Sequence, residues 1–84
     1  MKIVFSEQAW EDYQYWVGND KKILKRINQL IKESIRSPEQ GIGKPEKLRY
    51  GLSGYSSRRI NDEHRMVYRV DNDEICIAQL RYHY

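Results

Sequence analysis

This chain of 84 residues lacks several features that would assign a small protein to a common class. It has one cysteine, Cys76, so no disulfide can form within it, and a disulfide-stabilised secreted fold is excluded. No apolar run approaches the length of a membrane span, and no signal-peptide pattern opens the chain. Repeats and linkers are absent too. We therefore expect one domain over residues 1–84, in a reduced, cytoplasmic protein without a membrane partner.

Ligands for metal ions are also scarce. The chain has two histidines, His64 and His83, and no group of residues with the spacing of a metal site. We therefore expect no metal and no other cofactor. Cys76 lies in the apolar strand pattern "EICIAQL", where a thiol is expected to pack rather than to act as a nucleophile.

Positive charge is scarce at both ends of the chain and abundant between them. Residues 1–20 have a net charge of −3 and the last fourteen residues have −2. Residues 21–70 hold thirteen Lys or Arg against five Asp or Glu, a net charge of +8. This middle part is a candidate surface for a polyanion. For the lysines at 21, 22, 25 and 32, a solvated helix face explains the charge at least as well.

The order of the elements predicts an α+β fold: a strand, a helical hairpin and then a mainly antiparallel, twisted sheet. The run "KIVF" predicts a first strand whose pairing partner is open. Ser6 and Asp20 are placed to cap two helices, and "SPEQ" ends the second at Pro38. The expected apolar stripes are Ala9, Trp10, Tyr13, Trp16 and Val17, and then Ile23, Leu24, Ile27, Leu30, Ile31 and Ile35. A polar Gly/Pro loop follows, and then strand signals in "KLRY", "YSSRRI", "HRMVYRV" and "EICIAQLRYHY".

The lengths of the turns decide which strand residues share a face. A three-residue loop "NDE" would pair Arg59 with Arg65, and a three-residue loop "DND" would pair Val70 with Glu74. The face expected under the helices then consists of Met66, Tyr68, Val70, Cys76, Ala78, Leu80 and Tyr82. The opposite face consists of Arg59, Arg65, Val67, Arg69, Gln79, Arg81 and His83. A slip of one residue would change this assignment.

The second of these faces brings like charges together, which normally destabilises a sheet. An anionic ligand would explain several arginines beside a histidine on one face. An ion-pair network with Glu46, Asp62 or Glu63 would explain the same cluster equally well. The residues alone leave both interpretations open.

Several short motifs occur together in one order and spacing: "GKPE", "LSG", "SRRI", "EHR", "VY" and the terminal "RYHY". As a set they resemble the YoeB family of the RelE/ParE toxin superfamily, from type II toxin–antitoxin systems. The resemblance runs from "KIVFSEQAWEDYQYW" to the last residue. It implies a RelE-like, microbial-RNase-like fold and an endoribonuclease, or mRNA interferase, that cuts mRNA in the ribosomal A site and inhibits translation. The implied partners are a YefM-type antitoxin, the ribosome and mRNA, with a homodimer as a further option.

The resemblance also assigns roles to single residues. Glu46 in "KPEK" matches the general base, His83 in "YHY" the general acid, and Arg65 in "EHR" the phosphate-stabilising arginine. Tyr84 matches the terminal tyrosine of the site. The supporting and substrate-binding positions are Arg59, Arg49, Lys47, Glu63 and Arg81, with Glu63 expected to orient an arginine. The implied reaction is attack by the RNA 2′-OH, which needs an acid, a base and cations but no metal.

Two positions depart from the family pattern, and one histidine falls outside it. Where the family has a lysine and then a histidine, this chain has Arg49 and Tyr50. Arg49 keeps the charge, whereas a tyrosine cannot carry protons as an imidazole does near neutral pH. His64 is expected to be a surface residue of a tight turn. A non-catalytic toxin of the same superfold, or a nucleic-acid-binding module, would also fit a basic face, but neither needs the pair of Glu46 and His83.

Overall fold

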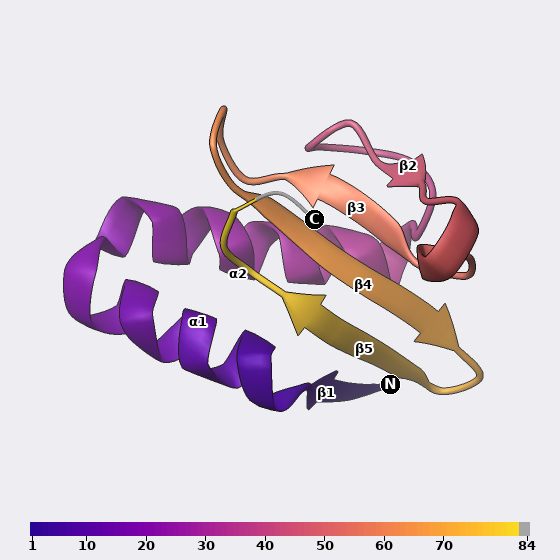
Figure 1. The fold of residues 1–84 in the computed structure, drawn as a ribbon, viewed down its shortest axis with the longest axis horizontal. Helices are drawn as coiled ribbons and strands as arrows, with labels where there is room; N and C mark the ends of the chain where they lie inside the picture. Colours follow the sequence, from indigo (N-terminus) through magenta and orange to yellow (C-terminus); the bar gives the residue numbers. More distant parts are fainter. Residues whose placement is uncertain (83–84) are drawn as a thin grey trace.

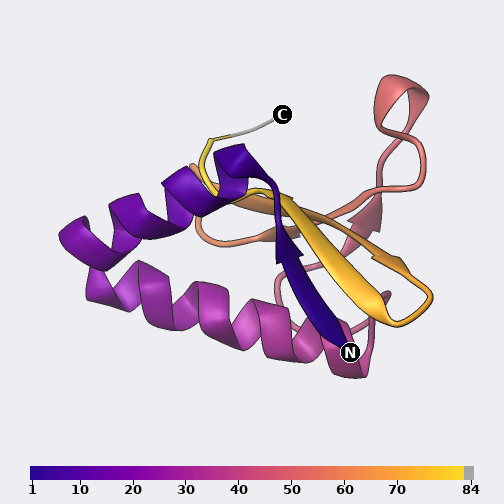
Figure 2. The ribbon, with the colours of Figure 1, turned by 90° about the horizontal axis from the view of Figure 1, so that it is seen from below.

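A strand, two helices and four further strands follow one another along the computed structural model, which describes residues 1–82. The elements are β1 (Lys2–Phe5), α1 (Glu7–Asn19), α2 (Lys21–Arg36), β2 (Glu46–Lys47), the 3₁₀ turn η1 (Tyr50–Leu52), β3 (Ser56–Arg59), β4 (Arg65–Asp71) and β5 (Glu74–Gln79). The two helices cover one face of the sheet (Figures 1 and 2). The predicted α+β class is confirmed. Among the described residues, no helix is long and apolar enough to cross a membrane.

The helices begin where the sequence predicts, because their caps are made as expected. The Ser6 hydroxyl accepts a hydrogen bond from the Ala9 N–H, and the Asp20 carboxylate accepts from the N–H groups of Lys22 and Ile23. The stripe of α2 packs into the core as predicted, with its middle residues buried and Ile23, Leu24 and Ile35 partly buried. The stripe of α1 is buried only in part, since Trp10 remains 52% exposed and Val17 45% exposed. The Trp10 ring stacks beside Tyr13 at the edge of the core, so the assignment of Trp10 to the core was wrong.

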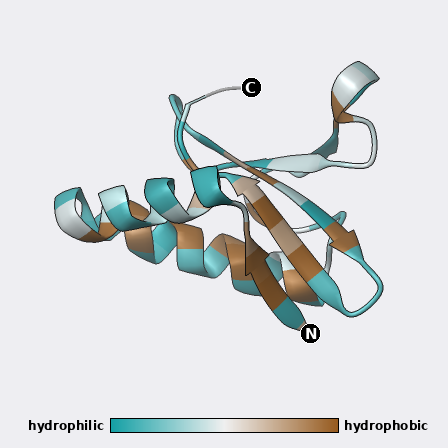
Figure 3. Cartoon of the chain, turned by 60° about the horizontal axis from the view of Figure 1, so that its bottom comes forward, coloured by the Kyte–Doolittle hydropathy of each residue, from teal (hydrophilic) through white to brown (hydrophobic). Residues whose placement is uncertain are grey.

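The sheet has the strand order β1-β5-β4-β3-β2. β1 pairs with β5 in parallel and every other pair is antiparallel, which settles the open position of the first strand. Apolar positions are concentrated along α2, β1 and β5 (Figure 3). The core between helices and sheet consists of Ala9, Trp16, Ile27, Leu30, Ile31, Ile60, Met66, Tyr68, Ile75, Ile77 and Leu80.

The β3–β4 turn has the predicted length, and Arg59 pairs with Arg65. The β4–β5 turn does not, because Asp71 pairs with Glu74 and leaves a two-residue turn. The left-handed Asn72 (φ 51°) makes this tighter turn, since asparagine tolerates that conformation. The expected pairing of Val70 with Glu74 was therefore wrong.

One consequence of the shorter turn is that Cys76 and Ala78 do not join the core, and Ile75 and Ile77 do. The register then shifts by one residue, because Val67 pairs with Gln79 while the next residue, Tyr68, pairs with Ile77. Because of this β-bulge, Gln79 lies on the open face of the sheet and Leu80 lies in the core, as predicted. Tyr82 was also assigned to the core, wrongly, since it is 53% exposed.

The loop between α2 and β2 is fastened to the sheet by a buried arginine. Arg58 is fully buried, and its guanidinium donates to the carbonyl oxygens of Ser37, Gln40 and Ile42 and to the Tyr68 hydroxyl. The Tyr68 hydroxyl in turn donates to a carbonyl of the same loop, at 2.6 Å. These bonds fix the course of the chain that leads into β2.

Candidate functional site

Three neighbouring strands bring Glu46, Ser57 and Arg65 together on the sheet face that the helices leave uncovered. Glu46 pairs with Ser57 across β2 and β3, and Arg65 follows on β4. One terminal guanidinium nitrogen of Arg65 lies 3.2 Å from Glu46 Oε1 and 3.1 Å from Ser57 Oγ. The Arg65 side chain is 16% exposed, whereas the Glu46 side chain is 54% exposed. A well-held cation therefore lies beside a carboxylate that faces solvent.

Arg59 lies directly across from Arg65 on the same face. Its backbone is fixed on both sides, because its N–H donates to the Gly43 carbonyl and its carbonyl accepts from the Arg26 guanidinium. Within residues 1–82, the Arg59 guanidinium has no hydrogen bond or ion pair. Among the described residues, an ion pair with Glu46 therefore accounts for Arg65, but no ion pair accounts for Arg59.

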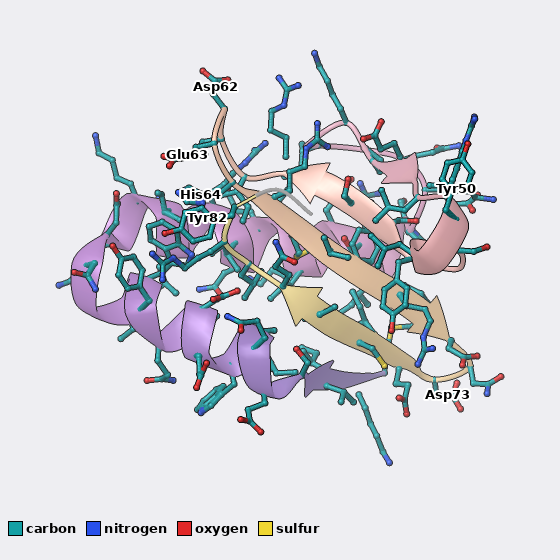
Figure 4. The ribbon with its side chains drawn as sticks, in the orientation of Figure 1. Tyr50, Asp62, Glu63, His64, Asp73 and Tyr82 are labelled. Atoms are coloured by element: carbon teal, nitrogen blue, oxygen red, sulfur yellow. The ribbon has the colours of Figure 1, made fainter. Side chains whose placement is uncertain are left out.

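Tyr82, the last described residue, lies next to Arg65. The N–H of Arg65 donates to the Tyr82 carbonyl (3.1 Å), and the Tyr82 N–H donates to His64 Nδ1 (2.8 Å). Tyr82 is left-handed, with φ 62°. Figure 4 shows Tyr82 beside His64, at the opposite end of the sheet from Tyr50. The predicted site residues His83 and Tyr84 lie outside the described residues.

His64 is not the surface turn residue that the sequence suggests. It is 6% exposed, and its ring packs edge-on against Trp16 with ring centres 4.9 Å apart. The turn that precedes it is closed by the Asn61 side chain, which accepts from the N–H groups of Glu63 and His64. The carboxylate of Glu63 lies 3.5 Å from His64 Nε2, and Glu63 makes no ion pair with an arginine within the described residues. The expectation that Glu63 orients an arginine is therefore not met there.

The remaining predicted site residues lie around this centre rather than in it. Lys47 points to the other face of β2 and pairs with Glu39 at 2.9 Å, and this hydrogen bond and charge raise the pKa of Lys47 above its ordinary value. Arg49 is exposed, next to Tyr50, which is 92% exposed on the η1 loop. Figure 2 shows this loop projecting from the sheet.

Arg81 does not lie on the arginine face, because β5 ends at Gln79. Its guanidinium lies 3.6 Å from the ring centre of Tyr15 on α1 and donates to the Tyr82 hydroxyl. The predicted arginine face is therefore made by Arg59, Arg65 and Arg69.

The family model that matches the chain describes the YoeB-like toxin of bacterial type II toxin–antitoxin systems, and the match covers residues 5–84. The chain belongs to this YoeB-like toxin family. The resemblance seen in the sequence is thus confirmed. Toxin YoeB of Escherichia coli strain K12 is 55% identical over 84 residues, which are the whole of both chains.

Solved structures of YoeB-like toxins have the same fold. A YoeB/ParE toxin from Agrobacterium tumefaciens is 43% identical and superposes with a TM-score of 0.97 over the whole of both chains. A heterotetrameric YoeB–YefM toxin–antitoxin complex from Staphylococcus aureus contains a chain that is 56% identical, with a TM-score of 0.93 over 100% of this chain and 98% of that one. YafQ from Escherichia coli, 17% identical with a TM-score of 0.74, shares the fold.

Sequence reasoning missed two residues that contact the candidate site of this YoeB-like toxin. Ser57 is buried and orients Arg65; its position two residues before Arg59, on the same face of β3, was a usable signal. His64 holds Tyr82, and no pattern in the sequence shows this, because the contact joins residues 18 positions apart.

Proposed function

We propose that this YoeB-like toxin is an endoribonuclease that cuts mRNA in the A site of the ribosome and so inhibits translation. The observation that carries the proposal is the position of Arg65. Its guanidinium lies 3.2 Å from the Glu46 carboxylate, and its backbone N–H holds Tyr82, the residue that precedes His83. A carboxylate, a guanidinium and the last described residue, Tyr82, therefore lie close together, and this supports the proposal.

The proposed reaction uses the substrate's own 2′-OH as the nucleophile. Glu46 takes the proton from this hydroxyl, and the oxygen attacks the adjacent phosphorus. Arg65 and Arg59 bind the phosphate oxygens as negative charge develops there, because a guanidinium fork matches phosphate geometry. His83 donates a proton to the leaving 5′-oxygen, and the product is a 2′,3′-cyclic phosphate. Each proton transfer would contribute about 10²–10⁴-fold to the rate.

The contacts around Arg65 support a phosphate-binding role for its guanidinium. The Ser57 hydroxyl accepts from the same guanidinium nitrogen as Glu46, so the arginine is oriented from the sheet side. An incoming phosphate would add a second anion at the exposed side of the fork. Arg59 would gain a partner at the same time, which would relieve the like-charge repulsion across the β3–β4 pair.

Mapping of mRNA 5′ ends on translating ribosomes tests the proposal. The unmodified protein is expected to produce new 5′ ends within codons at the A site, and Glu46→Gln is expected to remove them. The matched control is Glu11→Gln, which makes the same chemical change on the exposed side of α1. Ribosome or DNA binding without any new 5′ ends would instead support a non-catalytic toxin.

We further propose that a YefM-type antitoxin neutralises this chain and that the chain can dimerise, in the cytoplasm where ribosomes are found. The support comes from Staphylococcus aureus, where one solved structure is a YoeB–YefM complex and another is a YoeB dimer. The +8 charge of residues 21–70 favours an acidic antitoxin segment that is partly disordered before it binds. Binding measured at increasing salt is expected to weaken; salt-insensitive binding of a basic, pre-folded partner would contradict this.

A further inference from the structure

Side chains from α1 and from the β3–β4 turn hold the last described residues by their backbone groups. The Leu80 N–H donates to Asp12 Oδ2 and the Leu80 carbonyl accepts from the Trp16 indole N–H, both at 2.9 Å. Two residues later, the Tyr82 N–H donates to His64 Nδ1 at 2.8 Å. We call Asp12, Trp16 and His64 the terminal anchor.

These three side chains are buried, with exposures of 3% for Asp12, 5% for Trp16 and 6% for His64. Burial of a carboxylate in an apolar stripe is costly unless its oxygens are hydrogen-bonded. Asp12 has the Leu80 N–H on one oxygen and the Gln8 amide on the other (2.8 Å), and no cation pairs with it within the described residues. The buried polar atoms of the anchor therefore bind the backbone of residues 80–82.

The strand ladder of β5 does not continue into this segment, so side chains supply hydrogen bonds to it alongside one backbone bond from Arg65. β5 ends at Gln79, and Tyr82 has a left-handed φ of 62°, so the regular ladder of hydrogen bonds does not continue. The Gln79 side chain bonds the Arg81 carbonyl, and the Arg65 N–H bonds the Tyr82 carbonyl. The carbonyl oxygen of Tyr82, at the end of this segment, is therefore hydrogen-bonded to the Arg65 N–H.

We propose that Asp12, Trp16 and His64 are positioning residues: they fix residues 80–82 so that the chain continues into His83 and Tyr84 from beside Arg65. This inference rests on the proposed function, in which His83 is the general acid. A general acid acts only from a defined position, and a misplacement of about 1 Å can cost on the order of 10²-fold in rate. None of the three anchor residues needs to contact RNA.

The anchor also determines the tautomer of the neutral His64 ring. Because Nδ1 accepts from the Tyr82 N–H, the neutral ring carries its proton on Nε2, which lies 3.5 Å from Glu63 Oε1. A ring protonated at both nitrogens could not accept this bond. The expected spectroscopic signature is a ¹⁵N spectrum of the Nε2–H tautomer for His64 in the free protein.

Two substitutions separate the hydrogen bond from the packing of the ring. His64→Phe keeps an aromatic ring against Trp16 but has no acceptor. His64→Asn loses the ring but places an amide oxygen near the position of Nδ1. If the anchor acts through the bond, His64→Phe loses cleavage by roughly 10²-fold, and His64→Asn retains most of it. The reverse order would overturn the proposal, because it would assign His64 a packing role only.

Amide hydrogen exchange gives a second readout that does not depend on activity. In His64→Phe the Tyr82 amide is expected to exchange about tenfold faster or more, while the Leu80 amide, bonded to Asp12, is unchanged. Asp12→Leu is expected to release the Leu80 amide, and Asp12→Asn, which keeps an acceptor, is expected to protect it. Trp16→Phe, which removes the indole donor and part of the buried ring, is expected to reduce cleavage with the fold retained.

Tyr13→Phe is the matched control on α1, because it removes an exposed hydroxyl bond to Asn28 and Tyr13 takes part in none of the anchor hydrogen bonds. It is expected to leave cleavage and both amides unchanged. Faster exchange at Tyr82 in His64→Phe together with normal cleavage would overturn the positioning role. If the unmodified chain cut no mRNA, the proposed function would fail, yet the exchange pattern would still decide whether the anchor holds residues 80–82.

Discussion

Arg59 and Arg65 are direct cross-strand partners in the β3–β4 pair, on the sheet face that the helices leave open. Ser57 and Glu46 take up the Arg65 guanidinium, whereas Arg59 has no such partner among the described residues. Like charges directly opposite one another destabilise a sheet. We therefore expect this pair to lower the stability of the folded protein, and the proposed phosphate binding gives a reason for it.

Replacement of Arg59 is expected to stabilise the protein and to impair its activity. Arg59→Thr removes the repulsion and keeps a good strand residue, so the free energy of unfolding is expected to rise by about 0.2–1 kcal/mol. Ribosome-dependent cleavage is expected to fall. Urea denaturation at low and high salt measures the first effect, which should shrink as salt screens the charges. A loss of stability would contradict the interpretation.

Arg65→Lys is expected to lose most of the turnover while the fold is kept. A lysine supplies the charge but not the two-pronged donor that matches a phosphate, and the loss of one such donor costs about 10²–10³-fold. Single-turnover cleavage on ribosomes measures this. Ser57→Ala, which only releases the guanidinium from one contact, should have a smaller effect. Near-normal cleavage by Arg65→Lys would rule out the proposed role.

Deletion of Tyr84 is expected to leave the fold intact and to reduce cleavage. A terminal residue contributes little to a core, but a stacking contact with a base is worth about 1–3 kcal/mol. Deletion of both His83 and Tyr84 should abolish cleavage while binding to ribosome and antitoxin survives. Circular dichroism provides the folding control. Full activity of the doubly deleted, folded chain would mean that the general acid lies elsewhere.

Arg58→Met is expected to destabilise the protein strongly, although Arg58 is the immediate neighbour of a proposed site residue. The substitution leaves the partly buried carbonyl groups of Ser37, Gln40 and Ile42 without this donor. Each such group costs about 1–3 kcal/mol, so we expect a loss of ~3 kcal/mol or more. Tyr68→Phe, which removes one hydroxyl of the same network, should cost less. A change below about 1 kcal/mol in urea denaturation would contradict the fastening role of Arg58.

The pair of Lys47 and Glu39 gives a prediction for alkaline pH. Glu39 raises the pKa of Lys47 above its ordinary value of 10.5, so the pair stabilises the folded state when the lysine is charged. This contribution is present at neutral pH and is lost as the pH rises through the raised pKa. NMR titration of the Lys47 side chain is expected to show that Glu39→Gln returns its pKa to the ordinary value. An unchanged pKa would show that the pair is absent in solution.

Local signals in the sequence determined both helices, the β3–β4 hairpin and part of the site, whereas the strand expected in "KLRY" is confined to Glu46–Lys47. Ser6 and Asp20 predicted the starts of both helices because capping depends only on neighbouring residues. The loop "NDE" predicted the pairing of Arg59 with Arg65, since a hairpin register follows from its turn. The motifs around Glu46 and Arg65 carried the family resemblance, and the two side chains meet in the structure.

Tertiary structure alone decided the β4–β5 register and the surroundings of the chain end. The sequence "DND" allows two turn lengths. The left-handed Asn72 makes the shorter turn, which buries Ile75 and Ile77, and a bulge near Ala78 then returns Leu80 to the core. The sequence did not predict the burial of Asp12 and His64 either. Each becomes favourable only because a backbone N–H from a distant part of the chain bonds it, and such a partner exists only after the sheet and helices have packed.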